Sequence, residues 1–138
     1  MREDAHIGEL LREGLRRFEV DLLERLDAGA GPGLRLSHAS ILRHLDPDGS
    51  RASVLAERAG LSRQAITQVV DELERLGYVT RTPAPDDGRG KIVAYTEAGR
   101  AAFAASRGII AELEEGYAAR IGPRRYRAMR TALRDLLA

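Results

Sequence analysis

Polar side chains with the chemistry to read a nucleic acid are concentrated on one face of a predicted helix. They are Arg63, Gln64, Thr67, Gln68 and Asp71, opposite an apolar stripe. Arginine and glutamine can each form paired hydrogen bonds with base edges in a major groove, worth about 1–3 kcal/mol per pair. Ser62 precedes the helix, where a hydroxyl can cap the helix and donate to a phosphate. The same side chains also suit a solvated helix surface, so the neighbouring elements must decide between the two interpretations.

A glycine-flanked arginine follows in a second basic segment. Arg89 lies between two glycines in the sequence PAPDDGRG, where a thin hairpin could carry its guanidinium into a narrow minor groove. Lys91 and Arg81 flank this tip and are predicted to contact phosphates. Asp87 has the wrong charge to touch DNA, so we expect it to orient Arg89 or to close the turn. The alternative is that the tip is only a solubilising loop.

The spacing of small and apolar residues predicts a helix–turn–helix beneath the polar face. Ala56 allows two helices to approach, and Gly60 permits the left-handed backbone of the turn between them. Ile66 then packs the second helix onto the first. The second helix is expected to end at Gly77, which is placed for a left-handed cap.

A change of period follows this helix. The segments 78–82 and 91–95 are short and rich in β-branched and aromatic residues, and turn-forming residues separate them. This pattern predicts a β-hairpin. A helix–turn–helix followed by such a hairpin is a winged helix, and it places the polar face and the arginine tip on one unit.

Further helices are expected on both sides of this unit. The amphipathic pattern predicts them at about 4–28, from Ser37, from Ser50, at 97–120 after a Thr96 cap, and at about 124–137. We therefore predict a mainly α fold with a small β-hairpin, in which long N- and C-terminal helices form dimerisation arms. The predicted parts are an N-terminal arm at 1–36, the winged helix–turn–helix at 37–98 and C-terminal helices at 99–138.

Composition excludes several classes of protein. The 138 residues contain no cysteine, which excludes disulfides and thiolate metal sites. No apolar run approaches the roughly 20 residues of a membrane span, and the charged start is unlike a signal peptide, so we expect a cytoplasmic location. His38 and His44 do not share a helix face, and no nucleophile elbow or phosphate loop is present. We predict no metal, no cofactor and no enzymatic activity.

Charge is unevenly distributed along the chain. Residues 1–30 carry five arginines against eight acidic residues, and residues 120–138 carry six arginines against one aspartate. The central unit at 50–100 is nearly neutral, with eight basic and seven acidic residues. DNA binding would therefore depend on where the charges point and on more than one copy of the site.

The segments LSRQAITQVVDELERLGYVTR (61–81) and PDDGRGKIVAYTEAGR (85–100) resemble the MarR family of winged-helix transcription regulators. Asp87 and Arg89 match the wing signature of that family, and Val93, Thr96 and Gly99 match its strand and following helix. Gly88 stands where the family commonly has a second arginine. The resemblance implies a homodimer whose terminal helices interleave and whose two winged helices face one operator.

We therefore interpret the sequence as a regulator that binds double-stranded DNA, most simply a ligand-responsive repressor acting as a homodimer on a pseudo-palindromic operator. A small-molecule effector would enter between the first, second and fifth helices. Its predicted contacts are His38, Ile41, Phe103 and Arg107. The alternative is a winged-helix module that binds a protein partner and no DNA, which the near-neutral central unit also allows.

Overall fold

The computed structural model describes residues 2–85 and 90–138, which form helices and one small antiparallel sheet. The helices are α1 (Ile7–Asp27), α2 (Leu36–Leu42), α3 (Ala52–Ala59), α4 (Arg63–Arg75), α5 (Glu97–Ile121) and α6 (Pro123–Leu137). The strands are β1 (Ser50–Arg51), β2 (Val79–Pro83) and β3 (Lys91–Tyr95). The predicted mainly α fold with a winged helix–turn–helix is confirmed.

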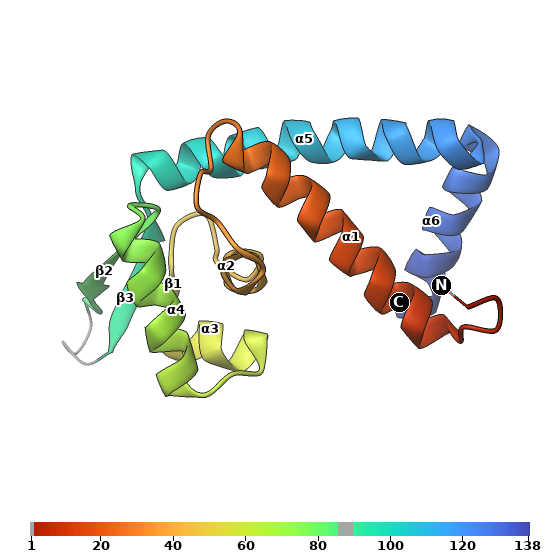
Figure 1. The fold of residues 1–138 in the computed structure, drawn as a ribbon. Helices are drawn as coiled ribbons and strands as arrows, with labels where there is room; N and C mark the ends of the chain where they lie inside the picture. Colours follow the sequence, from red (N-terminus) through yellow and green to blue (C-terminus); the bar gives the residue numbers. More distant parts are fainter. Residues whose placement is uncertain (1, 86–89) are drawn as a thin grey trace.

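The chain has a compact unit at one end and long helical arms that extend from it (Figure 1). Helices α2, α3 and α4 and the sheet form the unit, and α5 runs from the sheet along the length of the molecule. Helix α1 crosses beneath α5, and α6 turns back from the far end of α5. None of the helices in the described ranges combines the length and hydropathy needed to cross a bilayer.

The sheet contains a strand that the sequence pattern did not predict. Its order is β1–β3–β2, and Ser50 of β1 lies opposite Val93 of β3. Ser50 was expected to cap the third helix, and this prediction is wrong. Its hydroxyl donates to the carboxylate of Asp46 at 3.1 Å and accepts the Asp46 backbone N–H at 3.0 Å. Ser50 therefore closes the turn before β1 and has no hydroxyl left for α3.

Local capping chemistry sets several of the helix boundaries. The Ser62 hydroxyl accepts the Ala65 N–H at 3.1 Å, and the Thr96 hydroxyl accepts the Gly99 N–H at 3.0 Å, as predicted. Gly60 has a positive φ of 66° in the turn between α3 and α4. Ser37 is not a cap, because α2 begins one residue earlier and Arg35 occupies the cap position.

The start of α5 is pressed against the turn that follows α4. The Thr96 N–H donates to the Tyr78 carbonyl at 3.0 Å. A Cβ atom on Gly99 would lie only 2.0 Å from that same carbonyl oxygen. Glycine is therefore required for this approach, which fixes the direction in which α5 leaves the winged helix.

Candidate nucleic-acid interface

The predicted reading face of α4 is open to solvent. Ser62, Arg63, Gln64, Thr67 and Gln68 are all exposed. The opposite face, with Ile66, Val70 and Leu73, is buried in the core. The Thr67 hydroxyl donates to the Arg63 carbonyl at 2.8 Å, so its oxygen retains acceptor capacity. The amphipathic pattern thus presents the polar side chains together.

A hollow of about 440 Å³ lies beside the start of this helix. Arg51, Arg63 and Lys91 contribute cations to its wall from β1, α4 and β3, and Ser53 and Thr67 add hydroxyl groups. The first turn of α3, which includes Ser53, borders the hollow, and the backbone N–H groups of a helix start favour an anion. This donor set suits a DNA phosphate.

Arg51 and Ser53 are functional candidates that sequence reasoning missed. Arg51 enters the site because β1 pairs with β3, which brings Arg51 opposite Ile92 and next to Lys91. A strand of two residues gives no periodicity to detect. The position of Arg51 directly before the third helix was the only feature of the sequence that could have indicated its place in the site.

The wing is described at its base but not at its tip. In the antiparallel register Pro83 of β2 lies opposite Lys91 of β3, and Lys91 is exposed. The predicted minor-groove residue Arg89 lies outside the described residues, as does Asp87. Both assignments remain predictions.

Arg81, which was predicted to contact phosphate, lies against the recognition helix instead of standing free. Its guanidinium donates to Asp71, and to Glu74 at 3.3 Å, while its backbone N–H donates to Glu74 at 3.2 Å. Burial acts to lower the pKa of Arg81, but the hydrogen bonds to Glu74 and Asp71 outweigh it and raise the pKa. Two residues that were assigned separately to a DNA surface, Arg81 and Asp71, therefore form one bridge between β2 and α4.

His38 is buried and joins α2 to α4. Its side chain is 1% exposed. The Nδ1 atom accepts the Arg35 backbone N–H at 3.0 Å, so Nε2 carries the hydrogen and donates to Glu72 at 2.8 Å. The hydrogen bonds from His38 and Arg35 hold the pKa of Glu72 below its usual range, although partial burial acts to raise it.

A second, mostly apolar cavity of about 280 Å³ lies between α1, α2 and α5. Its walls include Leu22, Leu26, Ala39, Leu42, Ala102 and Phe103. Of the four predicted effector contacts, Phe103 is in this wall. His38 and Ile41 are not, because both side chains are buried in the winged helix, and Arg107 is exposed on α5 outside the wall.

Polar groups around this cavity are already engaged with the protein. Arg43 pairs with Glu19 at 2.8 Å, and both line the cavity. The Tyr78 hydroxyl donates to the Pro32 carbonyl at 2.5 Å, and the Tyr95 hydroxyl donates to the Leu42 carbonyl at 3.3 Å. The cavity therefore offers a largely apolar surface with one ion pair in its wall.

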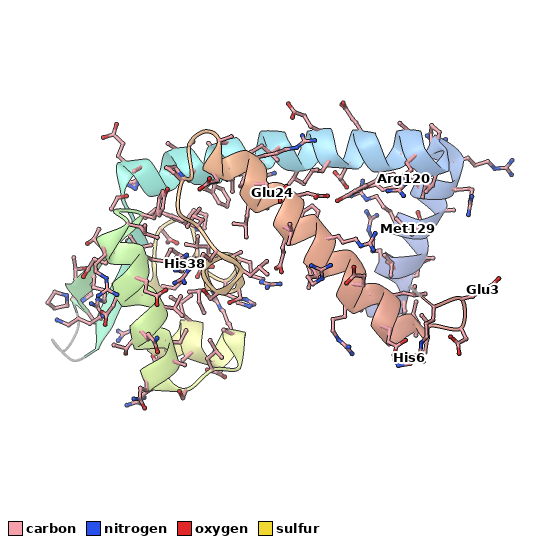
Figure 2. The ribbon with its side chains drawn as sticks, in the orientation of Figure 1. Glu3, His6, Glu24, His38, Arg120 and Met129 are labelled. Carbon is pink, nitrogen blue, oxygen red and sulfur yellow. The ribbon has the colours of Figure 1, made fainter. Side chains whose placement is uncertain are left out.

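Two of the three histidines lie far apart. His38 lies inside the winged helix and His6 lies at the start of α1, at the opposite end of the molecule (Figure 2). Across residues 2–85 and 90–138, no group of three or more histidine, aspartate or glutamate side chains is placed to hold a metal ion.

The exposed polar helix, the hairpin and the cation-lined hollow define a winged helix–turn–helix of the kind found in transcription regulators. Residues 33–90 match the model of the MarR family. This match covers less than half of the chain, so the likeness to the MarR family is one of the winged helix–turn–helix region, and the solved structures described next share the fold over nearly the whole chain.

Solved structures with this fold cover nearly the whole chain. The transcriptional repressor CouR, bound to a 23-mer DNA duplex, is 26% identical, with 96% of this chain and 93% of CouR covered and a TM-score of 0.73. A probable transcriptional regulator from Pseudomonas aeruginosa is also 26% identical, with 98% and 99% covered and a TM-score of 0.69. Wild-type MarR from E. coli, at 20% identity, 99% and 100% coverage and a TM-score of 0.81, shows the fold alone.

A shorter match links the chain to one curated protein of another activity. Riboflavin kinase of Thermoplasma volcanium is 42% identical over 48 residues, which is 35% of this chain and 20% of the kinase. The chain thus matches a fifth of the length of that relative, and the kinase activity is not extended to it.

Proposed function

We propose that this chain is a sequence-specific regulator of transcription that binds double-stranded DNA as a homodimer and acts as a repressor. The main support for this proposal is the hollow beside the exposed face of α4, where Arg51, Arg63 and Lys91 converge. Cations and a helix start hold the phosphate backbone, and the adjacent glutamines Gln64 and Gln68 read base edges. The proposal of DNA binding is supported by the likeness to CouR, a repressor whose solved structure is bound to a DNA duplex.

The arms support a dimer. Apolar side chains on α1 and α6 are exposed in the single chain, including Ile7 at 62% and Leu136 at 68%. Apolar faces of this extent need a partner, and the first and last segments carry opposite net charges. A second copy would cover both faces. It would also supply the second recognition helix. The two half-sites of an operator require recognition helices about 34–36 Å apart.

The apolar cavity supports control by a small molecule. Helix α2 has Ala39 and Leu42 on the cavity, while its His38 contacts Glu72 of the recognition helix. A ligand that displaces α2 would displace α4, and two recognition helices that no longer match the operator spacing would bind it less tightly.

Selection of duplexes from a random library, followed by fluorescence anisotropy on the selected sequence, tests this function. Gln68→Ala should relax the selected sequence and cost about 1–3 kcal/mol per half-site. Arg75→Ala is the control, because Arg75 is exposed at the C-terminal end of the same helix. The proposal fails if the selection enriches no duplex and if the affinity for duplex DNA does not decrease with rising salt concentration. That outcome would favour a protein-interaction module.

A further inference from the structure

An acidic side chain stands on the face of α4 that would meet DNA. Asp71 follows Gln64, Thr67 and Gln68 by seven, four and three residues, which places it on the same side of the helix. Its side chain is 41% exposed. A carboxylate near phosphates is repulsive by charge alone, so its position needs a physical account.

Asp71 is part of an ion-pair bridge that joins the recognition helix to the wing. Arg81 of β2 reaches both Asp71 and Glu74, and the Glu74 carboxylate also accepts the Arg81 backbone N–H. Strand β2 pairs along its length with β3, with Arg81 opposite Val93. The bridge therefore fixes the whole base of the wing to the outer face of the recognition helix.

The exposure of the three side chains argues against a direct contact by Arg81. Its side chain is 26% exposed, less than either carboxylate partner. Lys91 and Arg63, in contrast, are exposed around the cation-lined hollow. The Arg81 guanidinium is thus engaged by Asp71 and Glu74, and we expect the other cations to contact phosphate.

We propose that Arg81, Asp71 and Glu74 form a positioning bridge that sets the angle between wing and recognition helix, so that the two acidic residues favour DNA binding although their charge opposes it. The inference rests on the proposed function, because its value to the protein is the simultaneous fit of helix and wing to one operator. Arg81 is a positioning residue in this account and touches no phosphate.

The proposal and simple electrostatics predict opposite changes in DNA affinity when the two acidic residues are neutralised. If charges act independently, Asp71→Asn with Glu74→Gln removes two negative charges and tightens DNA binding. If the bridge positions the wing, the same pair of substitutions weakens binding, by about fivefold or more. Arg81→Met should then add little in the doubly substituted background, because the bridge is already broken.

The main experiment measures duplex affinity for the wild type, Asp71→Asn/Glu74→Gln, Arg81→Met and the triple variant. A matched control, Glu57→Gln/Glu97→Gln, removes the same charge from exposed positions on α3 and α5 and should bind slightly more tightly. Melting temperatures should stay close to wild type, because exposed ion pairs contribute little to stability. Tighter or unchanged binding by Asp71→Asn/Glu74→Gln would overturn the proposal.

A second measurement is independent of DNA. The chain contains no cysteine, so spin labels at Gln64→Cys and Thr82→Cys report the distance between the start of α4 and β2. We expect a narrow distribution in the otherwise unaltered protein and a broad one after Asp71→Asn/Glu74→Gln. An equally narrow distribution in both would overturn the bridge. If the unaltered protein binds no duplex, the proposed function fails, while the label distances still decide whether the bridge exists.

Discussion

The Nε2 atom of His38 lies 2.8 Å from Oε2 of Glu72, and this contact ties α2 to the recognition helix. His38 is inaccessible to solvent, whereas Glu72 is partly exposed. Because α2 also borders the apolar cavity, the pair lies between the proposed effector site and the proposed DNA site. Loss of the contact between His38 and Glu72 should lower the stability of the winged helix. It should also weaken the effect of a bound effector on DNA affinity.

Glu72→Gln should lower the melting temperature at neutral pH and have little effect in strong acid. The pKa of Glu72 is depressed in the folded protein, so the charged carboxylate stabilises the fold above its unfolded value of about 4.3. That contribution is lost as the pH falls through the lower folded pKa. Thermal melts between pH 7 and pH 3 measure it, and an equal deficit at both ends would contradict this assignment.

Gly99→Ala should destabilise the protein by about 3 kcal/mol, because the new methyl group would collide with the Tyr78 carbonyl. Gly108→Ala on the same helix is the control, since apart from the neighbouring backbone of its own helix no atom of residues 2–85 and 90–138 lies within 4 Å of its Cβ position. The control should gain roughly 0.5–1 kcal/mol from helix propensity. Urea unfolding of both variants checks the prediction, which fails if the two substitutions have the same effect.

Arg51→Ala should weaken DNA binding for all sequences alike. Each dimer would lose two phosphate contacts, so the slope of log affinity against log salt should fall by about two. Arg124→Ala removes the same charge from the exposed start of α6, far from the hollow, and should leave the slope unchanged. A salt titration of both variants provides the measurement. Equal slopes for Arg51→Ala and wild type would remove Arg51 from the interface.

Met129→Asp with Leu136→Asp should convert the proposed homodimer into monomers or aggregates. Both side chains are exposed on α6 in the single chain, and Met129 lies on the arm at the opposite end of the molecule from His38 (Figure 2). Burying a charge in the dimer interface without a partner is costly. Sedimentation at micromolar concentration checks this, and a monomeric unsubstituted chain would refute the dimer itself.

Local chemistry was readable from the amino-acid sequence. Ser62, Thr96 and Gly60 act within one turn of their partners, so residue type and spacing were sufficient to place the ends of their helices. The amphipathic stripe of α4 likewise predicted which side chains are buried and which are exposed. These determinants made the winged helix and its polar reading face predictable.

Contacts between distant residues were decided only by tertiary structure. His38 and Glu72 are 34 positions apart, and each alone is compatible with a surface, a pocket or a core. Strand β1 has only two residues and exists because β3 supplies its partner. Arg81 was assigned to phosphate from its charge, but its position in β2 brings it to Asp71 and Glu74 first. A residue type states which bonds a side chain can make, and packing decides which partner is within reach.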